Sequence, residues 1–294
     1  MTDIADLKSG KGERDENFPV ASVLIAPRHR PAILGFYRFA RAADDVADHP
    51  TLGEREKFAA LDSLESTLLG KSDSAADALP LRRALAETDL GTQHPLDLLT
   101  AFRLDVTKRR YRDWGELMHY CSYSAMPVGR FVLDVHGEAQ STWPPSDALC
   151  AALQVINHLQ DCAEDYRTLD RVYIPLEAFD AHGIGAGALA EPKASPQLRD
   201  CLTSLTRKTQ ELMPDATKLP HRVTSFRLAC ETAVIVGLAQ RLIGLLLARD
   251  PLSEGVHLSK VSTLAVAATS AGGLVKDRIL RQLWLGANPK SADL

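Results

Sequence analysis

Apolar residues recur along the chain at spacings of three and four, the period of an amphipathic helix. No segment shows the alternation of β-branched and polar residues that marks a half-buried strand. The pattern predicts an all-α fold, with loops where glycine and proline cluster. The expected helices are Pro31–Asp48, Leu52–Leu69, Ala78–Thr88, Pro95–Lys108, Trp114–Val135, Asp147–Arg167, Ser195–Met213, Val223–Ala248 and Leu258–Leu285.

The two ends of the chain differ in the structure that their sequences predict. Residues 1–16 are polar and lack the apolar core of a signal peptide, so we expect a flexible tail followed by one domain over residues 17–294. Near the other end, fifteen uncharged residues rich in Ala, Ser and Thr lie between Lys260 and Lys276. Because ~20 apolar residues are needed to span a bilayer, we interpret this run as part of a core helix and not as an anchor.

Composition and charge narrow the class of protein. Hydrophobic residues make up 45% of the 294 residues and charged residues 24%, as in globular chains with a sizeable core. The net charge of −4 disfavours nucleic acid as a partner, because nucleic-acid-binding proteins usually carry a basic patch. Five cysteines, widely spaced and without a CxxC pair, fit a reducing compartment and predict a cytoplasmic protein.

One stretch carries polar residues where a helix normally has its buried apolar face. At about 100° per residue, the side chains of Gln154, Asn157, Asp161 and Asp165 project within about 80° of one another. Apolar neighbours such as Leu159 indicate that this helix is packed within protein. A buried stripe of acids needs positive charge close by.

A second stretch repeats this arrangement nearer the N-terminus. Tyr37, Arg41, Asp44 and Asp48 share one helix face, and Asp45 lies beside them. Like charges four residues apart destabilise even an exposed helix by roughly 0.2–0.5 kcal/mol. Two matching acidic stripes therefore suggest a function that requires these acids despite their mutual repulsion.

Metal binding accounts for both stripes. Carboxylate and amide oxygens with few sulfur or imidazole partners favour Mg²⁺, with Mn²⁺ as an alternative, and Mg²⁺ commonly completes its coordination with substrate phosphate oxygens. A lone DDxxD sequence is more often a charged helix end, but two copies favour a site. A carboxylate di-iron site would need Glu-x-x-His pairs on two helices, which the sequence lacks. The expected metal ligands are Asp44, Asp45, Asp48, Asn157, Asp161 and Asp165.

With these residues in hand, the chain resembles the squalene/phytoene synthase family over about residues 17–260. The resemblance is carried by residues 18–22, by Tyr37–Asp48, by Tyr120–Gly129, and by Gln154–Asp165 followed by Arg171–Pro175. It implies a single-domain isoprenoid synthase helical bundle with a central cavity. It also implies that both acidic stripes bind metal ions, that Arg41 lies near the diphosphate, and that Tyr120 lines the cavity near the reacting carbons.

Departures from the family pattern favour one branch. Condensing members typically have arginine where this chain has Gln160, and glycine where it has Met126. The segments 16–22, 157–161 and 169–173 look like the bacterial hydroxysqualene synthase branch of hopanoid biosynthesis. The resemblance implies a catalytic set of Asp44, Asp48, Asp161, Asp165 and Tyr120, and substrate binding by Phe18, Ser22, Tyr37, Arg41, Tyr123, Gln154, Gln160, Arg171 and Tyr173.

The implied reaction is a carbon–oxygen lyase reaction on presqualene diphosphate. Metal-assisted ionisation releases diphosphate, the carbocation rearranges, and water captures it. Aromatic faces such as Tyr37, Tyr120 and Tyr123 suit a moving cation, although ordinary core packing explains them equally well. No dinucleotide-binding glycine motif follows a strand, so no NADPH is expected.

Two other functions stay open at this stage. One is a condensing prenyltransferase that makes presqualene diphosphate, dehydrosqualene or phytoene from prenyl diphosphates. The other is a non-catalytic relative that acts as an assembly factor. Because substrate and product are very apolar, transient contact with the inner face of the membrane or with neighbouring pathway enzymes is expected. His29, His119, His136 and His158 are interpreted as packed or surface residues and are assigned no role.

Overall fold

The computed structural model describes residues 25–287, and within them every helix or strand assigned is a helix. The only pairing of extended backbone in this range is an isolated parallel bridge between Arg110 and Val172. The predicted all-α class is confirmed. The longer helices are α1 (Arg30–Ala47), α2 (Glu54–Leu68), α3 (Leu79–Thr88), α4 (Gln93–Thr107), α5 (Trp114–Ser124), α6 (Met126–Val135), α7 (Trp143–Gln160), α8 (Cys162–Leu169), α10 (Pro196–Gln210), α13 (Phe226–Ala248) and α14 (Lys260–Ala287).

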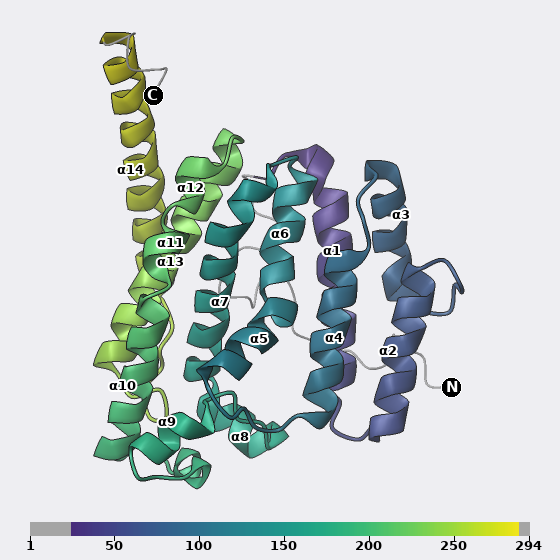
Figure 1. Cartoon of the computed structure of the whole chain (residues 1–294), viewed down its shortest axis with the longest axis vertical. Helices are drawn as coiled ribbons and strands as arrows, with labels where there is room; N and C mark the ends of the chain where they lie inside the picture. The colour runs from purple at the N-terminus through teal and green to yellow at the C-terminus, as the bar shows by residue number, and fades with distance from the viewer. Residues whose placement is uncertain (1–24, 288–294) are drawn as a thin grey trace.

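Helices α1, α4, α6 and α7 form the middle of the bundle (Figure 1). Helices α2 and α3 cover one side of it, and α10, α13 and α14 lie on the other. Three short helices, α9 (Leu176–Ala181), α11 (Met213–Ala216) and α12 (Leu219–Arg222), connect the longer ones. Both α1 and α7 run toward the end of the bundle where α8 lies, so their last turns lie at the same end.

Two predicted helices are each divided in the structure. The expected helix Trp114–Val135 breaks at Ala125, because Pro127 cannot supply the backbone N–H that a continuous helix would need. The expected helix Asp147–Arg167 breaks at Asp161 and begins earlier, at Trp143. Two prolines occupy the first turn of α7, where their missing N–H groups carry no penalty.

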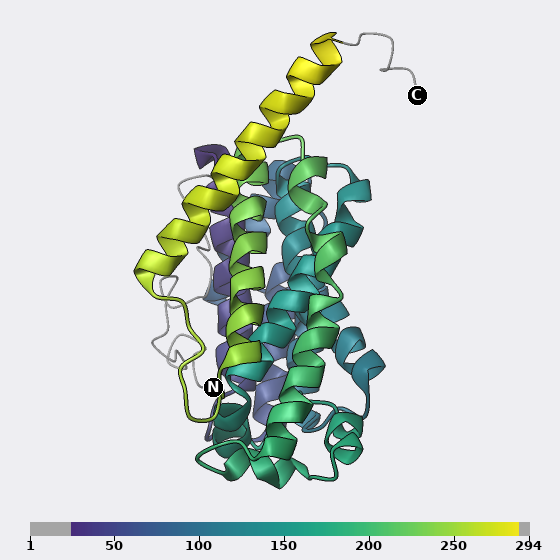
Figure 2. The ribbon, with the colours of Figure 1, turned by 90° about the vertical axis from the view of Figure 1, so that its left-hand side faces the viewer.

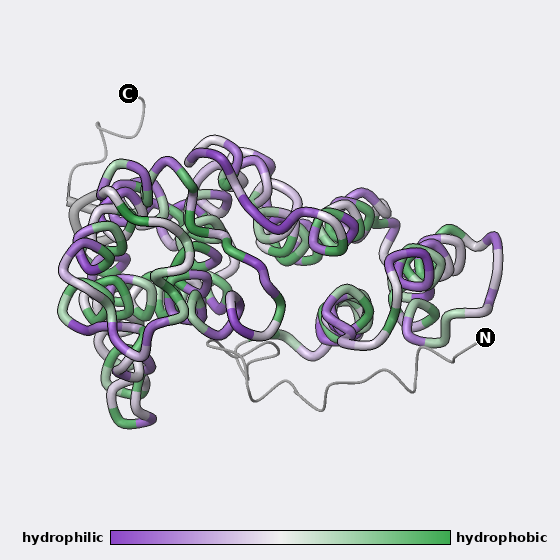
Figure 3. Tube along the Cα trace, turned by 90° about the horizontal axis from the view of Figure 1, so that it is seen from below, coloured by the Kyte–Doolittle hydropathy of each residue, from purple (hydrophilic) through white to green (hydrophobic). Residues whose placement is uncertain are grey.

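The buried side chains form two hydrophobic clusters. The larger cluster is built mainly from α5, α7, α10 and α13. The smaller one joins α1, α2, α3 and α4 to part of α6. In an end-on view the helices turn hydrophobic stretches inward, toward these clusters (Figure 3). Helices α6 and α7 pack on each other where the two clusters meet. Both helices line the cavity that lies between the clusters.

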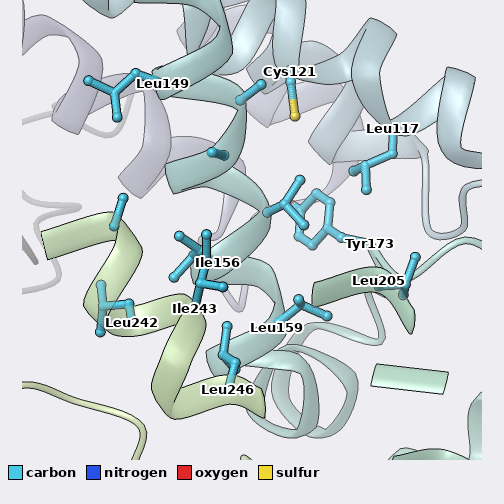
Figure 4. Close-up of a cluster of buried hydrophobic side chains, with 14 of the residues drawn as sticks. Leu117, Cys121, Leu149, Ile156, Leu159, Tyr173, Leu205, Leu242, Ile243 and Leu246 are labelled. Atoms are coloured by element: carbon cyan, nitrogen blue, oxygen red, sulfur yellow. The ribbon is translucent and has the colours of Figure 1, made fainter. Parts of the chain in front are cut away.

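Helix α13 is the core helix of the C-terminal region. Within the described residues it is the one helix long and apolar enough to cross a membrane, yet 56% of its most apolar window is buried inside the bundle. Its side chains Leu242, Ile243 and Leu246 pack in the larger cluster against Ile156 and Leu159 (Figure 4). Such burial is typical of a core helix of a globular protein.

Helix α14, in contrast, lies outside the bundle and extends beyond its end (Figure 2). Val261 is 77% exposed and Leu264 70%, so the interpretation of residues 261–275 as part of a core helix is wrong. The run is rich in Ala, Gly, Ser and Thr, which offer little apolar surface to bury. One face alone packs on α13, where Gly237 makes room for Ser270.

The proposed boundary between a tail and a domain at residues 16 and 17 lies outside the described residues and stays a prediction.

Candidate active site

The first acidic stripe lies on the C-terminal half of α1 and carries its own counter-charge. Arg41 Nη1 is 2.7 Å from Asp44 Oδ2, and Arg41 Nη2 is 2.9 Å from Asp45 Oδ1. The Asp45 side chain is only 7% exposed, whereas the Asp44 side chain keeps 36%. Arg41 thus pairs with both acids, but Asp45 is buried, whereas Asp44 and Asp48 are the acids of this stripe that stay partly exposed.

The second stripe crosses the break between α7 and α8. Asp161 ends α7 with φ of −99° and ψ of 5°, and α8 continues from it. The amide of Asp161 still donates to the Asn157 carbonyl and the amide of Asp165 to the Asp161 carbonyl, each at 2.9 Å. The helical spacing of the three residues therefore survives the break.

Arg171 joins the two stripes. Its guanidinium is 2.9 Å from Asp48 of the first stripe, and its charge lowers the pKa of Asp165 in the second. Burial, together with Asp161, nevertheless raises the pKa of Asp165 to about 7, and Asp48 adds to this effect. Burial and Asp48 likewise raise the pKa of Asp44 to about 7. The acids of the two stripes thus lie close enough to repel one another, as the sequence predicts.

Asp105 on α4 completes a buried network that the sequence reasoning missed. Tyr120 donates to Asp105 Oδ2 at 2.7 Å, and Tyr173 donates to Asp105 Oδ1 at 2.8 Å. Arg171 Nη2 donates to the Asp105 main-chain carbonyl at 2.8 Å. Burial raises the pKa of Asp105 to about 6, although Arg171 and the two tyrosines oppose the rise. The sequence does contain an indication of this buried acid, because Asp105 lies on the same helix face as the apolar residues Leu98 and Ala101.

Tyr173 itself is enclosed by core side chains (Figure 4). The ring of His158 stacks on it, with centroids 3.5 Å apart, and Gln154 Nε2 lies 3.1 Å from His158 Nε2. Burial and the nearby Arg171 lower the pKa of His158 to about 3, so this imidazole is neutral. Gln154, expected to bind substrate, contacts His158 in this structure, and His158 is a packed residue as expected.

An almost wholly apolar cavity of about 280 Å³ opens between the two hydrophobic clusters. Its wall includes Tyr37 and Ala40 of α1, one turn before Arg41 and Asp44, and Leu153 of α7, one turn before Asn157. The cavity therefore leads away from the acidic end of the bundle. Its described lining comprises Ile25, Ile33, Phe36, Tyr37, Ala40, Val128, Gly129, Phe131, Val132, Leu133, Ser146, Leu149, Cys150, Leu153, Leu219, Leu228, Glu231, Thr232 and Ile235.

The other predicted site residues are distributed unevenly around this cavity. Tyr120, Tyr123 and Tyr173 are not among its described lining residues, and Tyr123 instead packs its ring edge-on against His119. The buried amide of Gln160 donates to the carbonyl of Val256, which ties the end of α7 to the loop before α14. Phe18 and Ser22 lie outside the described residues. Of the predicted aromatic residues, Tyr37 is thus the one placed on the described cavity wall.

The donor set at the acidic end fits Mg²⁺. Among the described residues, no three His, Cys, Asp or Glu side chains gather closely enough to enclose a metal ion on their own. Mg²⁺ needs no such cage, because it keeps water ligands and binds through one or two carboxylates plus substrate phosphates. Burial, and then a neighbouring aspartate, raise the pKa values of Asp44 and Asp165 and so disfavour their charged forms, a penalty that a bound cation would relieve. The acids of α1 also lie at a helix C-terminus, where the helix dipole disfavours them.

Comparisons with known proteins point to one family. The model of squalene/phytoene synthase matches residues 12–262. A hydroxysqualene synthase of Rhodopseudomonas palustris is 54% identical over 291 residues, covering 99% of this chain and 98% of that protein. One of Sinorhizobium fredii is 52% identical over 264 residues, 90% of each chain. The crystal structure of squalene synthase HpnC from Alicyclobacillus acidocaldarius is 30% identical, with a TM-score of 0.70 over 82% of this chain and 90% of that one.

Proposed function

This chain belongs to the squalene/phytoene synthase family, and we infer that it converts presqualene diphosphate into hydroxysqualene. One observation carries the inference: identity with hydroxysqualene synthases exceeds 50% over nearly the whole chain, whereas the HpnC structure, named a squalene synthase, is 30% identical. The reaction is a carbon–oxygen lyase step within isoprenoid biosynthesis, in the hopanoid branch.

The site offers a separate place for each part of this substrate. The diphosphate would lie at the acidic end, between Asp44 and Asp48 on one side and Asp161 and Asp165 on the other. Mg²⁺, with Mn²⁺ as a substitute, would supply positive charge for the leaving diphosphate when bound there. The isoprenoid chains would lie in the apolar cavity, whose lining begins one helical turn away. The polar and apolar ends of the site match an isoprenoid diphosphate.

The chain's own residues then have distinct tasks. Arg41 and Arg171 pair with the acids and fix their orientation. When the C–O bond of the substrate breaks, its electron pair leaves with the diphosphate, whose developing negative charge has to be stabilised. Tyr37 lines the apolar cavity, where an aromatic ring could stabilise positive charge on carbon. Water then adds to the rearranged cation and loses a proton, which makes an alcohol.

This reaction is redox-neutral, so we propose that it proceeds without NADPH. The oxygen of the product comes from water, and no hydride is transferred at any step.

We also propose a cytoplasmic location with transient membrane contact. The five cysteines are all free, as in a reducing compartment, and the named relatives are bacterial. An apolar substrate and product would exchange most readily at a membrane surface or with a neighbouring enzyme of the pathway.

The decisive experiment supplies purified protein with Mg²⁺ and presqualene diphosphate, with and without NADPH, in H₂¹⁸O. The expected product is hydroxysqualene that carries the heavy isotope, formed at the same rate under both conditions. The Asp161→Ala variant serves as the catalytically impaired control. A hydrocarbon product, or a rate that depends on NADPH, would refute the assignment.

The condensing reaction is the second candidate, because the HpnC structure is named a squalene synthase. Incubation with farnesyl diphosphate alone tests it. Efficient coupling to a C30 product would move the protein to the condensing branch, whereas inhibition without coupling supports the proposed function. A folded protein that turns over neither substrate would indicate an assembly factor, a reading that the intact acidic stripes disfavour.

A further inference from the structure

Asp105 lies outside both acidic stripes, yet both oxygens of its carboxylate are engaged in the site. It is 4% exposed, and each of its carboxylate oxygens accepts one phenol, Tyr173 on Oδ1 and Tyr120 on Oδ2. A phenol has one proton to donate, so both hydroxyl groups are fixed in direction by this carboxylate. The hydroxyl of Tyr173 then accepts from Arg171 Nη1 at 3.2 Å.

The network leads from α4 to the first acidic stripe. Arg171 Nη2 donates to the Asp105 carbonyl at 2.8 Å, and Arg171 Nη1 donates to Asp48 Oδ1 at 2.9 Å. The guanidinium is therefore held by Asp105 on one edge and by Tyr173 beside it. Because the guanidinium is rigid and planar, fixing these contacts also fixes the donor that faces Asp48.

Stability alone does not explain an acid at this position. Asp105 shares the buried face of α4 with Leu98 and Ala101, and well-packed apolar residues in place of a buried ionic group are often neutral or stabilising. A fully connected polar network instead specifies the direction of each group in it. The benefit of Asp105 is thus expected in orientation at the adjoining site.

We propose that Asp105 is a positioning residue: through Tyr173 it aims the Arg171 guanidinium at Asp48, and so fixes the first acidic stripe relative to the second. This role rests on the proposed function, since it concerns the ionisation of a diphosphate held between the stripes. Asp105 contacts neither substrate nor cation in this scheme.

Asp105→Asn is the sharpest test, because the amide keeps the shape and one oxygen of the carboxylate. Its NH₂ group donates hydrogen bonds and cannot accept one, so the phenol that faces it loses its acceptor. We expect kcat on presqualene diphosphate to fall about 10–100-fold with KM changed less than about 3-fold, as for residues that orient a ligand-binding group. Tyr173→Phe should lower kcat similarly, and the double variant should lose no more than the stronger single one.

Asp134→Asn is the matched control. Asp134 accepts from Trp143 Nε1 and pairs with His94 Nε2 in a second aromatic–carboxylate network that lies away from the stripes. This variant should lose a comparable amount of thermal stability while kcat stays within about 2-fold of the wild type. A role of Asp105 in folding alone would make the two variants equal in kcat per folded molecule, which would overturn the proposal.

A second readout needs no turnover. The ¹³Cζ resonances of labelled tyrosines report hydrogen bonding in the metal-free protein, and Tyr120→Phe and Tyr173→Phe identify two of them. In Asp105→Asn one or both of these resonances should shift, while that of Tyr123 should not. Unchanged resonances would overturn the proposal whatever the kinetics. If the wild type fails to consume presqualene diphosphate, the proposed function fails, and the NMR result still decides whether Asp105 holds the tyrosines.

Discussion

The two acidic stripes face the same electrostatic problem and are neutralised differently. On α1, Arg41 lies within the same helix and binds Asp44 and Asp45, so this stripe can be assembled from one continuous segment. The stripe on α7 and α8 is interrupted at Asp161, and Arg171, whose charge opposes the rise in the pKa of Asp165, comes from the segment after α8. The Arg41 pairs of the first stripe are thus locally encoded, whereas its Asp48, which pairs with Arg171, and the second stripe depend on tertiary structure.

Despite this difference, each stripe contains one acid whose charged form is disfavoured by its surroundings. The pKa of one acid in each, Asp44 and Asp165, is raised to about 7, with burial as the main cause and a neighbouring aspartate as the next. Neither arginine is sufficient by itself. A cation bound between the stripes would stabilise the charged forms of both acids. Removing that cation is therefore the strongest test of the comparison.

Chelation with EDTA should abolish turnover of presqualene diphosphate, and added Mg²⁺ or Mn²⁺ should restore it. The expected loss is complete because neither stripe has enough positive charge of its own. Product formation measured by mass spectrometry across a metal titration checks this. Turnover in EDTA, or recovery with Zn²⁺ alone, would contradict the magnesium assignment.

Loss of a single acid should be nearly as severe. Asp44→Ala and Asp161→Ala should each lower kcat by about 10²–10³-fold, the cost typical of removing one group that stabilises developing charge. Circular dichroism should show an intact helical fold in both. Asp62→Ala, at a 65% exposed acid of α2, is the control and should be fully active. Full activity of both stripe variants would mean that the stripes are not the site.

The two arginines should differ in their effect on stability. Arg171→Met leaves Asp105 and Asp48 without their shared partner, and breaking a buried ion pair costs about 3–5 kcal/mol of unfolding free energy. The Arg41 side chain is 21% exposed, so Arg41→Met should cost less. Urea unfolding of both variants in EDTA measures the difference. Equal losses would show that local and tertiary counter-charges matter equally.

The same contrast explains what the sequence could predict. Helix positions follow from apolar periodicity, and the stripe on α1 follows from spacing within one helix, because both signals are local. The role of Arg171 in joining the stripes depends on the fold, and the partners of Asp105 lie 15 to 68 residues away in the sequence. Asp105 could have been noticed as an acid on an apolar face, but its partners could not.

The C-terminal helices show the limit of composition as a guide. The uncharged run of α14 suggested a core helix, yet it is the apolar α13 that packs into the bundle. Small side chains fit a close helix contact on one face, as Ser270 does at Gly237, without supplying enough apolar area to bury the rest. Absence of charge is therefore a weaker indicator of burial than large apolar side chains at helical spacing.

The smallest expected effect concerns pH and compares one acid from each stripe. A carboxyl whose pKa rises from 3.8 to about 7 on folding binds protons more tightly in the native state, so it lowers the unfolding free energy progressively as pH rises through this interval. Asn cannot ionise, so Asp44→Asn and Asp165→Asn in EDTA should each gain in Tm relative to the wild type as pH rises from 5 to 8. Because the Asp44 side chain keeps 36% exposure, solvent screening should keep its gain small.

Thermal melts at pH 5, 6, 7 and 8 measure the trend. Asp113→Asn is the control, because the pKa of Asp113 is lowered by the amide of Glu116 and the side chain of Arg112. A gain that is largest at pH 5, or a loss at pH 8, would show that the acids of the two stripes are already balanced without a bound cation.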